Sequence, residues 1–128
     1  MFWKFVGVGA LVVLAFDTAA ALASARFGFS YSFAIVGSIL IYSSIGFLAF
    51  RQWGLGRALA ATILVQIVDS TLGWYISWKI GPGALPPDQA IPSVFVATFV
   101  FVIVFAAFFG LVGSALARVI YGPTNPGA

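Results

Sequence analysis

The sequence predicts an all-α integral membrane protein, a bundle of four transmembrane helices forming a single domain over residues 1–128. Of its 128 residues, 62% are hydrophobic and only 7% are charged, and a soluble domain of this size needs more ionisable groups to cover its surface. Four apolar runs are each long enough to cross the hydrocarbon core of a bilayer. Because lipid cannot satisfy exposed backbone N–H and C=O groups, we expect these runs to be helices and not open strands.

The first apolar run covers about residues 5–25 and lies between Lys4 and Arg26. Its length suits one crossing, because roughly 20 residues at about 1.5 Å each span the hydrocarbon. A signal peptide is the alternative, since a basic residue, an apolar run and the small residues at 23–25 also occur around signal-peptide cleavage sites. Asp17 would be unusual inside a signal peptide, so we expect the segment to be retained as a helix.

Three further helices are expected at about residues 32–50, 57–79 and 92–120. The connector at 52–57 is short, so the second and third helices should be antiparallel neighbours. The external loop at 81–91 contains prolines and glycines and should run irregularly over the membrane surface. The tail at 122–128 has no apolar face to bury and should be loose.

Basic residues at the helix ends predict the orientation of the bundle, because the end with more Lys and Arg faces the cytoplasm. One end receives Lys4, Arg51, Arg57 and Arg118, and the other receives Arg26 and Lys79 together with Asp88. Both termini are therefore predicted to be cytoplasmic, in a multi-pass protein of the cell (inner) membrane. The lipid bilayer is the first expected partner.

The third helix carries a polar and small stripe on one face. Its members are spaced by three or four residues, which places them above one another on a helix: Thr62, Gln66, Asp69, Gly73 and Ser77. The other faces are apolar. This pattern is typical of a helix that faces other helices or a wet cavity on one side and lipid on the other.

The two halves of the chain share landmarks that suggest two parallel helical-hairpin repeats. Asp17 and Asp69 each lie near the middle of an odd-numbered helix and are followed by a hydroxyl residue. In the even-numbered helices, Gly46 and Gly113 each precede an arginine by five residues. A duplication of this kind has a pseudo-two-fold axis along the membrane normal. Chance is the alternative, because all helical hairpins have basic ends and small residues.

Inserting a carboxyl group near the centre of a bilayer costs roughly 2.5 to 3.5 kcal/mol on insertion scales, so such residues usually have a functional or structural role. We expect Asp17 and Asp69 to face a shared cavity and to exchange a proton or bind a cation. The candidate ion, proton or cavity-lining residues are Asp17, Asp69, Gln66, Tyr42, Ser43, Ser44, Thr18 and Ser70. The structural alternative is that these groups only form hydrogen bonds between helices and set their register.

The function predicted from this pattern is proton- or cation-linked transport or permeation. A non-catalytic accessory or structural subunit of a larger membrane complex is the alternative, suggested by small residues that allow close helix contact, such as Ala15, Ala19 and Ala23. The fourth helix has little polar lining, so a conducting form should need a homo-oligomer or a larger membrane complex.

Composition excludes several other classes of function. Cysteine, histidine and glutamate are all absent, which removes thiolate and imidazole chemistry and the usual metal ligands, so neither a metal nor a cofactor is expected. The basic residues form no patch, and no nucleic-acid partner is expected. We do not expect an enzyme: Asp17 and Asp69 could form an aspartyl dyad only if their carboxyl groups came within hydrogen-bond reach.

Overall fold

The computed structural model describes residues 1–28, 30–82 and 84–123, and the described residues form helices and connectors without a strand. The predicted all-α class is confirmed, and four helical spans are long and apolar enough to cross a membrane. The tail residues 124–128 lie outside the described residues.

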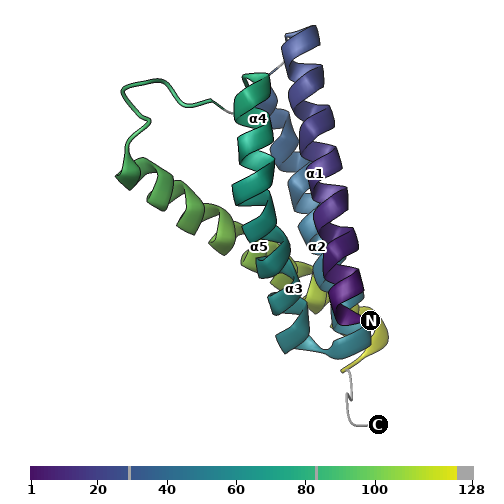
Figure 1. The fold of residues 1–128 in the computed structure, drawn as a ribbon. Helices are drawn as coiled ribbons and strands as arrows, with labels where there is room; N and C mark the ends of the chain where they lie inside the picture. The colour runs from purple at the N-terminus through teal and green to yellow at the C-terminus, as the bar shows by residue number, and fades with distance from the viewer. Residues whose placement is uncertain (29, 83, 124–128) are drawn as a thin grey trace.

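The chain alternates in direction from one helical span to the next (Figure 1). The helices are α1 (Phe2–Phe27), the short η1 (Tyr31–Phe33), α2 (Ala34–Trp53), α3 (Leu55–Val68), η2 (Asp69–Gly73), α4 (Trp74–Ile80) and α5 (Pro92–Tyr121). The third span is thus built from three pieces, of which η2 is a π-helical turn. Gly28 and Gly54 end α1 and α2 with positive φ angles of 74° and 84°, which glycine adopts without strain.

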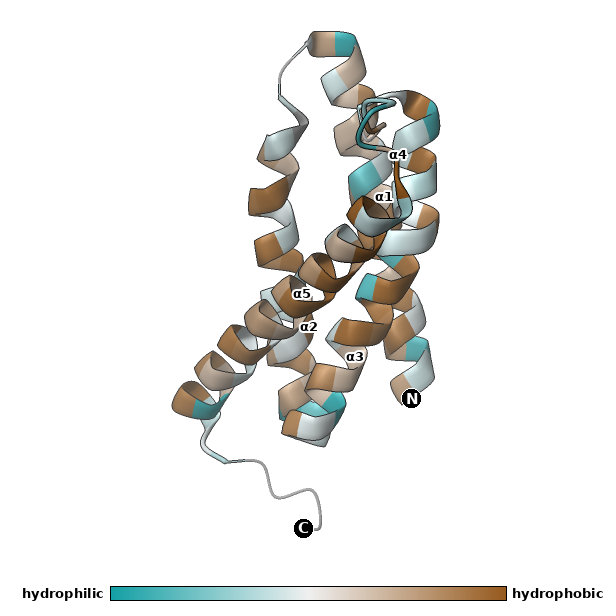
Figure 2. Cartoon of the chain, turned by 90° about the vertical axis from the view of Figure 1, so that its left-hand side faces the viewer, coloured by the Kyte–Doolittle hydropathy of each residue, from teal (hydrophilic) through white to brown (hydrophobic). Residues whose placement is uncertain are grey.

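Helices α1, α2 and the span α3–η2–α4 run side by side, whereas α5 crosses them at a steep angle (Figures 1 and 2). The C-terminal half of α5 packs on α2 and α3, and its N-terminal half diverges from the bundle together with the loop that precedes it. Figure 2 shows that α5 is hydrophobic along almost its whole length. Its large apolar side chains are widely exposed, among them Val96, Val100, Phe101, Val104 and Phe108.

Glycines allow α5 to approach α2 and α3 closely. A Cβ atom on Gly46 of α2 would overlap the backbone of Gly110 in α5, and one on Gly113 would overlap the carbonyl group of Ser43. The Ser114 hydroxyl donates to the Gly110 carbonyl oxygen at 2.8 Å and also reaches the Gly46 carbonyl oxygen at 3.3 Å, so it links α5 to α2. Small residues with one bridging hydroxyl are the usual means of helix association in lipid.

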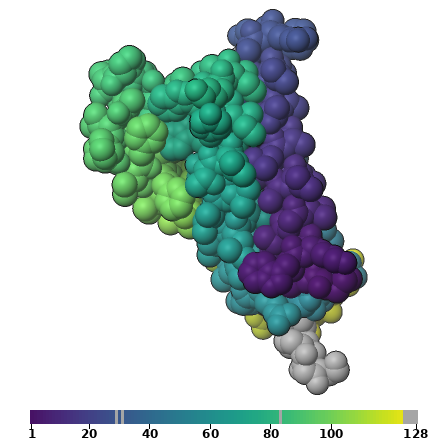
Figure 3. Space-filling model, in the orientation of Figure 1, coloured from purple at the N-terminus to yellow at the C-terminus, as the bar shows by residue number. Residues whose placement is uncertain are grey.

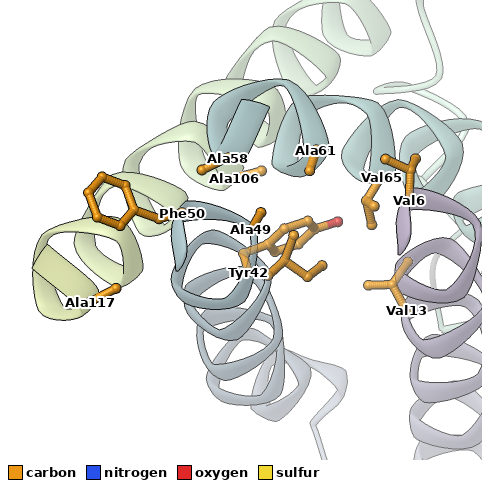
Figure 4. Packing of buried hydrophobic residues seen from close by; sticks show 11 residues of the cluster. Val6, Val13, Tyr42, Ala49, Phe50, Ala58, Ala61, Val65, Ala106 and Ala117 are labelled. Atoms are coloured by element: carbon orange, nitrogen blue, oxygen red, sulfur yellow. The ribbon is translucent and has the colours of Figure 1, made fainter. Parts of the chain in front are cut away.

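The apolar core occupies the half of the bundle that holds the start of α1 and the end of α2, and Figure 4 shows how its residues pack. Its smallest members are alanines with no exposed surface, which bring the helix backbones together. Val13 of α1 and Val65 of α3 are completely buried one helical turn before Asp17 and Asp69, respectively. The core therefore ends just below the level of the two carboxyl groups.

Candidate functional site

The carboxyl groups of Asp17 and Asp69 lie against each other where α1 packs on η2. The two groups come within side-chain hydrogen-bonding range. Both lie beside Gly73, next to the position that a Cβ atom would occupy. A Cβ atom at position 73 would lie 3.4 Å from Asp17 Oδ2 and would overlap Asp69 Oδ1. Two residues that lie 52 positions apart in the sequence thus form one acidic pair.

The π-helical turn Asp69–Gly73 positions the second member of this pair. A π turn takes more residues than an α turn, and such turns inside α-helices are frequent at functional sites. The turn keeps the stripe of the third span facing inward on both sides of it: Thr62 and Gln66 before it and Ser77 after it are buried. Gly73 is also buried, and its missing side chain leaves the room that the Asp69 carboxyl group fills.

Two polar side chains donate hydrogen bonds to Asp69, and a third supports one of them. The Tyr42 hydroxyl donates to Asp69 Oδ2 at 3.3 Å, and the Gln66 amide nitrogen donates to the same oxygen at 3.4 Å. Gln66 also donates to the Ser70 hydroxyl oxygen at 3.4 Å, and the Ser70 hydroxyl donates to the Gln66 carbonyl oxygen. Asp69 Oδ1 is buried and has no donor among the described side chains. One carboxylate oxygen is therefore held by two donors, while the other is enclosed beside Gly73 without a hydrogen-bond partner.

A cavity of about 370 Å³ reaches both carboxyl groups between α4, the 81–91 loop and α5. Figure 3 shows this part of the surface hollowed between α4 and the first half of α5. The cavity is lined by Asp17, Gln66, Asp69, Ser70, Trp74, Ser77, Pro82, Ala84, Leu85, Thr98 and Val102. It opens at the loop end because α5 diverges from the bundle there.

A second cavity, of about 550 Å³, approaches Asp17 from the side of η1 and the start of α2. It shares Asp17 and Pro82 with the first cavity, and three serines contribute to its wall: Ser30, Ser32 and Ser38. Asp17 thus lines both cavities and Asp69 only the first, and no Lys or Arg is among the described lining residues of either.

The apolar core closes the opposite side of the pair. Tyr42 is 1% exposed and its ring packs among the core residues. Figure 4 shows its hydroxyl group pointing out of the core, between Val13 and Val65. Below these residues a Cβ atom on Gly9 would lie 3.1 Å from Val65 and 3.4 Å from Ile45. An apolar groove of about 330 Å³ remains between α1 and α2 at this level, and it contains neither carboxyl group. The pair therefore lies where the polar cavities meet the apolar core.

Aromatic rings join α4 to the beginning of α5 beside the first cavity. The centroid of the Phe95 ring lies 5.2 Å from that of Trp74 and 5.8 Å from that of Trp78. The two tryptophan rings, one helical turn apart, have centroids separated by 6.3 Å. Such contacts between rings stabilise helix packing beyond simple burial. They hold the indole of Trp74 in the cavity wall.

Three of the candidate hydroxyl residues lie apart from the pair or turn away from it. Thr18 donates to the Leu14 carbonyl oxygen of its own helix at 2.7 Å, and Ser44, which is exposed, donates to the Leu40 carbonyl oxygen at 2.7 Å. Ser43 and Ser44 line a groove between α2 and α5 that contains neither carboxyl group. Of the eight candidates, the structure brings together Asp17, Asp69, Gln66, Tyr42 and Ser70.

Sequence reasoning did not select Ser77, Trp74 or Thr98, which also line the cavity. Ser77 could have been found, because it belongs to the inward stripe of the third span. Trp74 reads as an interface aromatic residue and Thr98 as an isolated hydroxyl on an apolar helix, so the sequence contains no signal that connects them to the pair.

Comparison with protein-family models, with curated proteins and with solved structures gave no match. The chemistry of the site therefore has to be inferred from its geometry. Two adjacent carboxyl groups in a medium of low dielectric repel each other strongly when both are ionised, and a shared proton or a nearby cation relieves this repulsion. The amide and phenol donors on Asp69 Oδ2 fix the orientation of the pair.

Proposed function

We propose that this chain is an integral membrane protein that carries a proton or another cation across the bilayer, with Asp17 and Asp69 as the binding site. The observation that supports this proposal most directly is the cavity that reaches both carboxyl groups from one end of the bundle. Ionisable groups within membrane spans usually mark ion pathways or proton relays. A pair with only a structural role would be expected in a dry core, with each of its oxygens bonded to neighbouring side chains.

The proposed orientation places both termini in the cytoplasm of a cell (inner) membrane protein. Four basic residues support it, at the end of the bundle that holds the start of α1 and the end of α5: Lys4, Arg51, Arg57 and Arg118. The opposite end carries only Arg26 and Lys79, and Asp88 offsets one of these charges. By the positive-inside rule the cavity then opens to the outside.

In the proposed mechanism a shared proton and a cation alternate on the acidic pair. When the proton leaves through the cavity, two negative charges remain in a region of low dielectric, and this charge attracts a cation. Binding of the cation expels the proton, and binding of a proton expels the cation. Tyr42 and Gln66 hold the Asp69 carboxyl group in position in both states.

Alternating access requires the apolar core below the pair to open while the outer cavity closes. The proposed duplication offers a way to do this, because two hairpins related by a two-fold axis can rock against each other. Residues close to such an axis contact their own equivalents. Asp17 contacts Asp69, and Gly113 packs against the turn of α2 that contains Gly46; both contacts support the proposed duplication.

An accessory subunit is the second candidate, supported by the exposed apolar surface of α5. Of the most apolar 18-residue window of this helix, only 11% is buried within the chain. Lipid could cover this face, but a second copy or a larger membrane complex could also pack against it. If the chain is an accessory subunit, the acidic pair positions its helices. Replacing Asp17 or Asp69 by asparagine would then affect assembly of the complex and not ion flux.

A catalytic aspartyl dyad requires two carboxyl groups within hydrogen-bond reach, and Asp17 and Asp69 meet this condition. We nevertheless propose transport, because a hydrolytic dyad needs a bound water between its carboxyl groups and donors for the developing oxyanion. The donors that reach the pair, Tyr42 and Gln66, are both directed at Asp69 Oδ2 itself.

Ion flux in proteoliposomes tests this proposal. Purified protein is reconstituted with a pH-sensitive dye inside the vesicles, and the decay of an imposed pH gradient is followed in solutions of different cations. Wild type should dissipate the gradient at least about tenfold faster than protein-free vesicles, and Asp69→Asn, which keeps the shape of the side chain, should remove this difference. Asp88→Asn is the matched control, because Asp88 is an exposed loop residue, and its flux should equal that of wild type. Flux that is absent in wild type, or unchanged in Asp69→Asn, would exclude transport through this pair.

A further inference from the structure

We propose that the cation carried at the Asp17–Asp69 pair is a small organic ammonium ion, with N–H groups for the carboxyl oxygens and an apolar or aromatic body for the cavity wall. This inference depends on the proposed function, because it names the class of cargo for the same site.

Two buried oxygen atoms at the cavity have no hydrogen-bond donor among the described residues. They are Asp69 Oδ1 and the hydroxyl oxygen of Ser77, whose side chain is only 2% exposed. Ser77 lines the same cavity as both carboxyl groups. Buried polar atoms without a partner are rare and costly, so their presence here indicates a missing donor. An ammonium group supplies several N–H donors, whereas a proton shared by the two carboxyl groups satisfies only one bond and leaves Ser77 without a partner.

A metal ion fits this site less well than an ammonium ion. The described residues contain no group of three or more Asp, Glu, His or Cys side chains that could hold a metal ion. Hard cations such as calcium require six or more oxygen ligands, and magnesium requires an octahedral set. Besides the two carboxyl groups, the cavity wall carries the amide of Gln66 and the hydroxyl groups of Ser70, Ser77 and Thr98, and the rest of its lining is apolar or aromatic, which a metal ion does not require.

An organic-cation site also needs a surface that packs against the body of the ligand, and the indole of Trp74 provides one. Its ring lies in the cavity wall and is held by its contacts with Trp78 and Phe95. Aromatic faces attract cations and also pack against apolar groups. The side chains of Leu85 and Val102 complete an apolar wall that an inorganic ion would not need.

The size of the cavity agrees with a cargo of several heavy atoms. Its volume of about 370 Å³ lies within the range of roughly 300 to 1,000 Å³ that is common for small-molecule sites. A single water molecule accounts for about 30 Å³ in the liquid, so the space exceeds what one inorganic ion with a few waters would fill.

Calorimetric titration of the purified protein in nanodiscs with benzylammonium tests this inference. Benzyl alcohol serves as the neutral ligand of similar shape, and sodium as the inorganic cation. We expect benzylammonium to bind at least about tenfold more tightly than either. Asp69→Asn should weaken its binding about tenfold or more, and Ser77→Ala about three- to tenfold. Trp74→Leu should also weaken binding, because it removes the indole from the cavity wall. Trp3→Leu is its control, since Trp3 is 72% exposed at the opposite end, and binding by this variant should not change.

Ser77→Ala also separates a ligand site from a structural role. Removal of an unpaired buried hydroxyl should leave the unfolding temperature of the empty protein equal or higher, while the affinity for benzylammonium falls. Equal binding of benzylammonium and benzyl alcohol, or binding unaffected by both Asp69→Asn and Ser77→Ala, would overturn the inference.

Flux measurements distinguish failure of this inference from failure of the proposed function. Neutral benzylamine crosses lipid unaided, so the comparison is made with Asp69→Asn vesicles: if benzylammonium accelerates decay of the pH gradient more in wild type than in Asp69→Asn, both proposals are supported. If flux depends on Asp69 but benzylammonium neither binds nor alters it, the cargo class is wrong and cation transport stands. If benzylammonium binds through Asp69 without any flux, the ligand class is supported as binding and carriage across the membrane is overturned.

Discussion

Gly73 lies against the carboxyl group of Asp69 so closely that a methyl group at position 73 would overlap Asp69 Oδ1. The same methyl group would lie 3.4 Å from Asp17 Oδ2. The absence of a side chain at this one position therefore sets the geometry of the acidic pair.

Gly73→Ala should move the Asp69 carboxyl group away from Asp17 and from its donors Tyr42 and Gln66. We expect Asp69-dependent flux to fall at least about tenfold, the effect of ~1.4 kcal/mol, while the helices remain folded, because the overlapping atom is the end of a side chain that can rotate. Flux and the circular dichroism of the variant are the measurements. Gly56→Ala is the matched control, because a Cβ atom there would meet nothing within 4 Å. Normal flux in Gly73→Ala would contradict this role of Gly73.

Tyr42→Phe removes one donor from Asp69 Oδ2 and keeps the ring that packs in the core. Hydrogen bonds between membrane helices contribute about 0.6 kcal/mol on average and up to ~1.7 kcal/mol. We expect a loss of stability in this range, measured as the midpoint of unfolding in a denaturing detergent, together with slower flux because the carboxyl group is less well oriented. Tyr75→Phe is the control, since Tyr75 is 62% exposed, and it should change neither quantity. A Tyr42→Phe variant with the stability and flux of wild type would show that the hydroxyl is not needed.

The helical class could be predicted from the sequence because it depends on local properties. Composition, the length of the apolar runs and the chemistry of the connectors act within a few residues of each position. The inward stripe on the third span follows from helical spacing alone, and four of its five members are buried in the structure: Thr62, Gln66, Gly73 and Ser77.

The π turn at Asp69–Gly73 and the steep crossing of α5 could not be predicted in this way. Both depend on packing between segments distant in the sequence: the turn on the space beside Gly73, and the crossing on the contact of Gly110 and Gly113 with α2. The positions of Ser43 and Ser44 have the same origin, because the rotation of α2 about its axis turns Tyr42 toward the pair and the two serines toward a different groove.

Gly113→Ala should weaken the contact between α5 and α2. The added Cβ atom would overlap the carbonyl group of Ser43, and the backbone of a helix cannot rotate aside as a side chain can. Overpacking of this kind costs about 1 to 3 kcal/mol. We expect the free energy of unfolding to fall by that amount, measured in a denaturing detergent. Gly7→Ala should show no such loss, because its Cβ atom would meet nothing within 4 Å. Equal stability of the two variants would mean that α5 does not approach α2 as closely as described.

The proposed orientation predicts which single cysteines react from outside the cell. The chain has no cysteine of its own, so each introduced thiol is the only one present. Asp88 lies exposed in the loop at the cavity end, and Gly56 lies exposed at the opposite end, in the first turn of α3. A membrane-impermeant maleimide should label Asp88→Cys on intact cells, and it should label Gly56→Cys only after the membrane is permeabilised. Because the net basic charge at the Gly56 end determines this orientation, replacing Arg51 and Arg57 with glutamine should reduce the difference between the two sites. Labelling in the reverse order would place the cavity on the cytoplasmic side and contradict the assignment.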